Sequence, residues 1–216
     1  MTNDALELDV TDELFWDPKI DSEAVAVSAK DGTVTLRGTV GSFRQKREAQ
    51  KAAQRVYGVV SVDNKLDVRI LNEDRREDAA LRGDVLQALM LDSLVPSSVD
   101  AKVTDGFVTL TGDADWQFQR EEAAFIAGNI VGVAGIENDI NLKSPTPYAG
   151  AVKHSIRKAI KRDAKLDADN IEVDTTDGMA ILSGTVRSWA EHDDAVAAAW
   201  AAPGVTSVKD ELSIAY

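Results

Sequence analysis

The chain has 216 residues and a formal net charge of −13, which disfavours general nucleic-acid binding because the phosphate backbone repels an acidic protein. It contains no Cys, which excludes disulfides, thiolate zinc sites and a Cys nucleophile. The acidic start lacks the basic and apolar sections of a secretory signal, and no apolar run approaches the roughly 20 residues of a membrane span. We therefore expect a cytoplasmic protein without a transmembrane segment, periplasmic only if the native start lies elsewhere.

The first part of the chain predicts an α-β-β-α-β order. Leu6, Val10 and Leu14 are four residues apart, which is typical of a helix, and the helix is expected over residues 4–16. Alternating apolar residues on both sides of an Asp-Gly pair at 31–32 predict a hairpin, because Gly accepts the positive φ of a tight turn. A second helix is expected from the N-cap Ser42 to a stop at Gly58, followed by another strand.

The same order occurs twice more along the chain. A charged linker precedes a second unit, whose second helix is expected over residues 117–131 with Gly128 inside it. A linker with two prolines at 144–147 precedes a third unit, whose helices are expected near residues 148–164 and 188–202. The Asp-Gly hairpin pattern recurs in each unit with a period of roughly 72 to 74 residues. The repeat is defined by nine glycines: Gly32, Gly38, Gly58, Gly106, Gly112, Gly132, Gly178, Gly184 and Gly204.

These patterns predict an α+β protein of three tandem modules, expected at residues 1–71, 76–143 and 148–216. Each module is expected to hold a three-stranded sheet with two helices on one face, because the stretch between the second strand and the third holds one helix and its turn but not two. The order of the strands within each sheet stays open.

The repeated pattern resembles the BON domain family. The resemblance rests on Asp-Gly-x-Val-x-Leu-x-Gly, on a helix beginning near Ser42 or Ser188, and on a closing Gly-Val-x-x-Val-x-(Asn/Asp)-x-Leu strand. It implies an α-β-β-α-β module, often in tandem, and a role in holding proteins to phospholipid or envelope surfaces. The family is best known from osmotically inducible periplasmic proteins, and it has no established catalytic residues.

Two helices present basic faces that are candidates for binding an anionic surface. The first helix of the third unit is an amphipathic helix with cations around one apolar stripe, and such helices can lie on anionic bilayers. The plainer interpretation is a solvated face that pairs with the acidic middle unit. The candidate residues are Lys153, Arg157, Lys158, Lys161 and Arg162, with Arg44, Arg47 and Lys51 on the second helix of the first unit.

Other candidate sites have simpler explanations. Residues 191–194 read Glu-His-Asp-Asp, but neighbours on a helix point in different directions, so an exposed acidic turn is expected rather than a metal site. Ser188, His192 and Asp193 lack the nucleophile elbow of a triad, and Ser188 is expected to cap a helix. We therefore expect no enzyme activity, no metal and no cofactor.

The sequence favours a non-catalytic, stress-related adaptor whose modules bind anionic phospholipid, an envelope surface or a protein partner. The alternative is a cytoplasmic sensor of a small ligand or ion. The family that the chain resembles includes a cytoplasmic potassium sensor that combines a BON and a LysM module, but no LysM segment is visible in this chain.

Overall fold

The computed structural model describes residues 2–71, 74–143, 149–163, 166 and 169–215. Its contacts divide the chain into two compact units, one of residues 1–112 and 122–140 and the other of residues 113–121 and 141–216.

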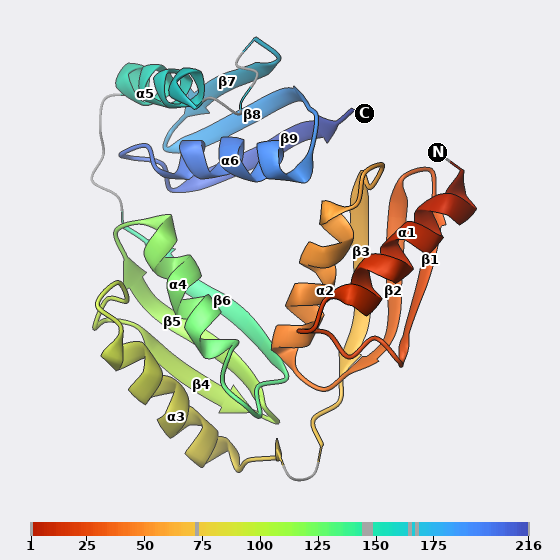
Figure 1. Ribbon diagram of the computed structural model, residues 1–216. Coiled ribbons are helices and arrows are strands. Elements are labelled where there is room, and N and C mark those ends of the chain that lie inside the picture. Colours follow the sequence, from red (N-terminus) through yellow and green to blue (C-terminus); the bar gives the residue numbers. More distant parts are fainter. Residues whose placement is uncertain (1, 72–73, 144–148, 164–165, 167–168, 216) are drawn as a thin grey trace. The chain divides into compact units, whose positions relative to one another are not determined.

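In the described part, three modules repeat the order helix, strand, strand, helix, strand (Figure 1). The first contains α1 (Asn3–Trp16), β1 (Val25–Lys30), β2 (Thr33–Val40), α2 (Phe43–Arg55) and β3 (Ser61–Val68). The second contains α3 (Asp78–Leu91), β4 (Asp100–Thr104), β5 (Phe107–Ala114), α4 (Gln117–Ala127) and β6 (Gly135–Leu142). The third contains α5 (Ala149–Arg162), β7 (Ile171–Thr176), β8 (Met179–Val186), α6 (Trp189–Trp200) and β9 (Ser207–Ile214). The prediction of three α-β-β-α-β modules is confirmed.

Each sheet follows the order of its strands along the chain, so that the middle strand of the sequence is also the middle strand of the sheet. β1 pairs antiparallel with β2, as the tight hairpin requires, and β7 pairs with β8 in the same way. β3 and β9 run parallel to β2 and β8, because the helix between them carries the chain back to the starting edge. This is the strand order that the sequence left open.

The hairpins turn through two residues with positive φ. Asp31 and Gly32 have φ of 50° and 78°, and the other two hairpins repeat these values at Asp105 and Asp177 and at the glycines that follow them. Such turns match the twist of the flanking strands, and Asp and Gly are the residues that adopt them most readily. The first helix fastens the turn in two modules: Asn3 Oδ1 accepts the Asp31 backbone N–H at 3.0 Å, and the Asp78 carboxylate accepts the Asp105 N–H at 2.9 Å.

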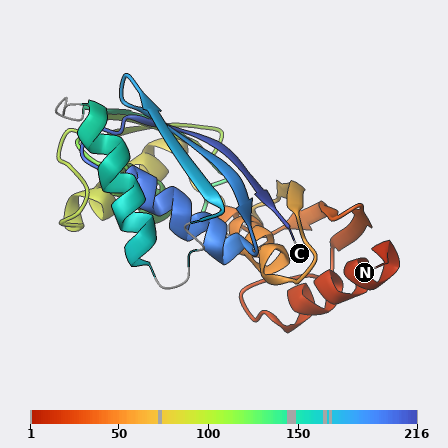
Figure 2. The same cartoon turned by 90° about the horizontal axis from the view of Figure 1, so that it is seen from above.

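The core of a module lies between its sheet and its two helices, which lie on the same side of the sheet (Figures 1 and 2). Leu6, Val10 and Leu14 of α1 are buried at the predicted spacing, against Val34 and Leu36 of β2. The third module repeats this arrangement with Val152, Ile156 and Ile160 of α5, which pack in one cluster with residues of β8 and α6. The alternating pattern of the middle strand therefore places one face inward, as predicted.

The second helices begin as the sequence indicates. Ser42 Oγ accepts the Gln45 N–H at 3.2 Å, and Ser188 Oγ accepts the Glu191 N–H at 3.1 Å, so both serines cap their helices. The expected extent of α4 is wrong, because the helix ends at Ala127 and Gly128 follows it. There the backbone changes to bonds between residues three apart, from Asn129 N–H to the Ile126 oxygen and from Ile130 N–H to the Ala127 oxygen.

Candidate functional site

Helix α5 holds five cations, Lys153, Arg157, Lys158, Lys161 and Arg162, together with His154, and it has no carboxylate. Its buried stripe of Val152, Ile156 and Ile160 fixes the rotation of the helix on the sheet, since each is less than a tenth exposed. Residues one or two positions from this stripe therefore point outward. Arg157, Lys158, Lys161 and Arg162 are all exposed, so the structure brings the predicted cations of this helix to one outer face.

Four of these five cations have no ion-pair partner among the residues that the structure describes. Lys153 is the exception: its Nζ lies 3.1 Å from Asp174 Oδ1 on β7. The hydrogen bond from Lys153 lowers the pKa of Asp174 below its usual value, helped by the Thr175 N–H and the charge of Arg157. The remaining α5 cations, Arg157, Lys158, Lys161 and Arg162, are available to an external anion, and we call them the α5 basic face.

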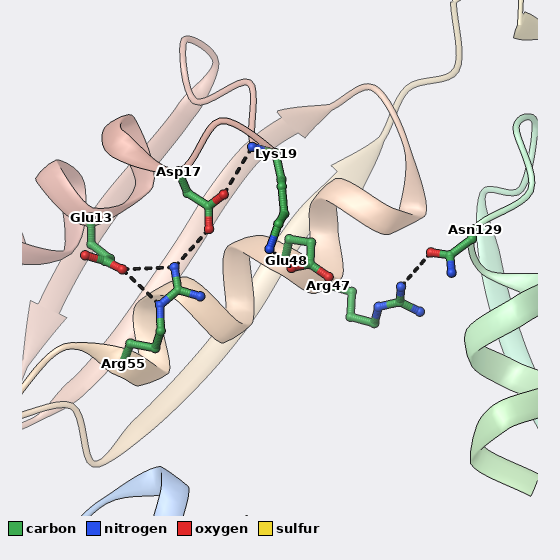
Figure 3. Close-up of polar contacts among 7 residues, drawn as sticks. All are labelled: Glu13, Asp17, Lys19, Arg47, Glu48, Arg55 and Asn129. Atoms are coloured by element: carbon green, nitrogen blue, oxygen red, sulfur yellow. Dashed lines mark hydrogen bonds and ion pairs between the residues drawn. The ribbon is translucent and has the colours of Figure 1, made fainter.

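The second predicted patch, on α2, is divided in the structure. Arg44 and Lys51 are exposed. Arg47 instead turns toward the end of α4, where its Nη2 donates to Asn129 Oδ1 at 2.7 Å (Figure 3). Its guanidinium carbon also lies 4.6 Å from the Phe125 ring centroid. Burial lowers the pKa of Arg47, with the nearby Arg44 contributing, and its Nε is buried without a hydrogen-bond partner. Arg47 therefore ties the first module to the second and leaves Arg44 and Lys51 as the exposed cations of the predicted α2 patch.

Gly128 belongs to the same contact between the first two modules. A Cβ added at Gly128 would lie 3.0 Å from Cδ1 of Phe43, the first residue of α2. A larger side chain would push the phenyl ring away. The absence of a side chain at Gly128 therefore permits this close approach.

A second polar cluster fastens the end of α1 to the end of α2 (Figure 3). Arg55 Nη2 lies 2.9 Å from Asp17 Oδ2, and Arg55 Nε donates to Glu13 Oε1 at 2.9 Å. The hydrogen bond from Arg55 lowers the pKa of Asp17, and the Lys19 N–H, 3.1 Å from Asp17 Oδ1, acts in the same direction. In return, Asp17 raises the pKa of Arg55. The carboxyl of Asp17 is only 7% exposed, so this cluster has a structural role within the first module.

The nine repeat-defining glycines all have positive φ, between 78° and 125°. They lie in hairpin turns, in the middle strands and at the ends of the second helices. Their positions explain the repeat by backbone geometry rather than by ligand binding.

Ser188 and His192 each have other hydrogen-bond partners in the structure. The Ser188 hydroxyl is engaged as a helix cap, and His192 lies between two carboxylates, with Nδ1 3.0 Å from Asp193 Oδ1 and Nε2 2.7 Å from Asp210 Oδ2. The expected exposed acidic turn is wrong for Glu191, which is 5% exposed and accepts the Arg187 backbone N–H at 2.6 Å. Reaching back to the start of its own helix is what buries this carboxylate.

A groove in the first compact unit does not select a ligand class. The first compact unit has a groove of about 1050 Å³, whose wall includes Lys46, Arg69, Arg75 and Arg76 but also Asp67, Glu77, Asp78 and Asp105. Such a mixed wall favours neither anions nor cations. Among the described residues, no group of three or more His, Asp or Glu is placed to hold a metal ion, and none of the described helices is long and apolar enough to cross a membrane.

Comparison with known proteins agrees with this fold. A model of the BON domain matches residues 2–70, 77–144 and 150–216. Osmotically-inducible protein Y of Escherichia coli (strain K12) is 36% identical over 148 residues, which cover 66% of this chain and 74% of that protein. Two solved structures of CdsD, described as a structural protein of the type III secretion system of Chlamydia trachomatis, cover 96% and 100% of the chain. Their identities are 16% and 15% and their TM-scores 0.27 and 0.28, too low to support an inference. The family match extends over nearly the whole chain, and the chain therefore belongs to the BON domain family, with three BON domains in tandem.

Proposed function

We propose that this protein is a non-catalytic, stress-related adaptor that associates with anionic phospholipid surfaces through the α5 basic face. The observation that carries the proposal is the concentration of cations on α5 without a single carboxylate on that helix. The similarity to an osmotically inducible protein supports a role in the stress response. An adaptor that binds an envelope protein, or a sensor of a small ion, stays a prediction, as does the cytoplasmic location.

The overall charge shapes the kind of binding to expect. A protein of net charge −13 is repelled by an anionic bilayer at long range, so attraction arises only where the local field of a basic patch dominates. That field extends about one Debye length, roughly 8 Å at physiological salt. We expect weak association that is lost at high salt.

The burial of the apolar stripe decides the binding mode. Ile156 is fully buried and Ile160 is 2% exposed against the module's own core, so over residues 152–162 α5 has no apolar face left to insert into lipid. The helix can offer a bilayer only its charged side. Binding should therefore depend on headgroup charge and not on acyl-chain packing.

Co-sedimentation with vesicles tests the proposal. The parent chain should sediment with phosphatidylglycerol vesicles at low salt, and should stay in solution at high salt or with phosphatidylcholine vesicles. Each cation near an anionic surface contributes about 1 kcal/mol, so loss of two lowers the partition coefficient about 30-fold. The variant Lys158→Glu, Arg162→Glu should therefore fail to sediment.

A charge-matched control separates a local patch from net charge. Lys30→Glu with Lys102→Glu makes the same change in net charge at exposed positions on β1 and β4, and it should sediment as the parent does. If the parent fails to sediment at low salt, or if both double variants weaken binding equally, the α5 basic face is not the lipid site.

A further inference from the structure

The outward face of α1 carries large apolar side chains with no cover. Phe15 is 68% exposed, Trp16 is 77% exposed and Leu8 is 61% exposed. The two aromatic rings stack edge to face, with centroids 5.5 Å apart, so they form one small platform at the end of the helix. Exposed aromatic residues grouped in this way are typical of a protein contact surface.

The charged residues of α1 itself are all negative; the nearest cation at the end of the helix, Arg55 of α2, is paired with Glu13 and Asp17. Helix α1 has five carboxylates and no cation. Four of them, Asp4, Glu7, Asp9 and Asp12, are exposed and have no ion-pair partner among the described residues. An occupant of this face must therefore be basic, and its cations should also suit aromatic rings, since a cation over a Phe or Trp face is attracted by the ring.

The chain itself provides a surface of that chemistry. α5 occupies the place in the third module that α1 occupies in the first, and the buried stripes have the same spacing. Outward positions correspond one to one: Lys158 stands where α1 has Asp12, and Lys161 and Arg162 stand where α1 has Phe15 and Trp16. The two helices thus present outer faces of equal length and opposite charge.

We propose that α1 of one copy docks on α5 of a second copy, with the acidic and aromatic face of α1 against the α5 basic face. Such a contact is heterologous, because each copy uses a different surface. Each copy keeps one free α1 and one free α5, so association continues head to tail. A contact of two helix faces falls in the class of small, transient interfaces, below about 1,200 Å².

The test is sedimentation equilibrium of the full chain without lipid, over concentrations from about 10 μM to about 1 mM. If the dissociation constant lies near the upper concentration, the weight-average mass should rise to about twice that of the monomer there. The increase should disappear in 1 M salt, where the Debye length is about 3 Å. A mass that stays monomeric at all concentrations overturns the proposal. A contact between α1 and α5 of the same chain would give this monomeric result and would overturn it as well.

Two variants identify the surfaces. Phe15→Ser with Trp16→Ser removes the aromatic platform and leaves α5 intact, while Lys158→Glu with Lys161→Glu reverses α5 and leaves α1 intact. Each variant alone should remain monomeric. An equimolar mixture should form a dimer and stop there, because one functional α1 meets one functional α5 and no further pair exists.

Met90→Ser with Leu91→Ser is the matched control, since these exposed residues end α3 as Phe15 and Trp16 end α1. This control should associate as the parent does. Association of either single-surface variant alone, or a mixture that stays monomeric, contradicts the head-to-tail contact. Because no lipid is present, the result is independent of vesicle binding.

Discussion

The first helices of modules 1 and 3 have the same inner face and opposite outer faces. In both, three apolar residues four apart lie buried against the sheet. The outer side of α1 has carboxylates and exposed aromatic rings, whereas that of α5 has cations and no carboxylate. The comparison teaches that the BON fold fixes the buried stripe, and that the outer positions are free to carry the chemistry that distinguishes one module from another.

The framework common to both modules should be the most sensitive to substitution. A Cβ added at Gly38 would lie 1.9 Å from the Ala24 carbonyl oxygen, and one at Gly184 would lie 2.1 Å from the Asn170 oxygen. Both glycines also have φ of 119°. We expect Gly38→Ala and Gly184→Ala each to lower the free energy of unfolding by about 3 kcal/mol or more, measured by urea denaturation.

Gly83→Ala is the matched control for this prediction. It lies inside α3, and a Cβ there meets nothing within 4 Å. Alanine should raise the free energy of unfolding of its module by about 1 kcal/mol, through higher helix propensity. Equal effects of the three substitutions would show that the close approach in the sheet does not matter.

The ion pair between Arg55 and Asp17 that holds the end of α1 has no counterpart at α5, because the third module has Ala201 at the position that Arg55 occupies in the first. We expect Asp17→Ala to lower the free energy of unfolding of the first module by about 2 kcal/mol, since it leaves Arg55 without its nearly buried partner. Asp92→Ala is the control in the second module, where the carboxylate accepts the Leu94 N–H. It should cost about 1 kcal/mol. If Asp17→Ala and Asp92→Ala lowered the free energy of unfolding equally, the ion pair with Arg55 would contribute nothing to stability.

The same ion pair predicts a pH dependence. Because the pKa of Asp17 is lowered in the folded protein, its contribution is fully present above the unfolded value of about 3.9 and is lost as pH falls through the folded value. The difference in the free energy of unfolding between the parent and Asp17→Asn should therefore shrink between about pH 5 and pH 2. A difference that is constant over this range would contradict the assigned role of the carboxylate.

The smallest effect is expected at the outer positions themselves. Phe15→Lys with Trp16→Arg gives α1 the two residues that α5 has at these positions, both of which are exposed. The free energy of unfolding should change by less than about 0.5 kcal/mol. Leu14→Ala, one residue away at a buried position, should cost about 2–5 kcal/mol. A large loss from the outer exchange would mean that the two faces are not independent.

Much of the fold could be predicted from the sequence, because local chemistry determines it. Ser42 and Ser188 cap helices, the Asp-Gly pairs turn hairpins, and Leu6, Val10 and Leu14 are buried as their spacing indicates. The position of β2 in the middle of its sheet could not be predicted, because an apolar alternation carries no information on strand order.

The candidate site could be predicted only in part. The basic outer face of α5 follows from helical spacing. The hydrogen bond of Arg47 could not be predicted from helical spacing, since its partner Asn129 is 82 residues away and belongs to another module. Glu191 was misjudged for a related reason: a carboxylate at a helix start was expected to face solvent, but its bond to the Arg187 backbone N–H draws it inward. Contacts of this kind depend on tertiary geometry that spacing does not contain.

The most direct test of the central claim is a backbone amide NMR titration of the full chain with phosphatidylglycerol nanodiscs. At about 10 μM protein, where the proposed contact between copies is unoccupied, signals of residues 153–162 on α5 should shift or broaden first and most, and those of residues 3–16 on α1 should stay unchanged. Addition of salt should reverse the changes. Perturbation centred on α1, or spread evenly over both helices, would contradict the claim that the outer face of the first helix decides what each module binds.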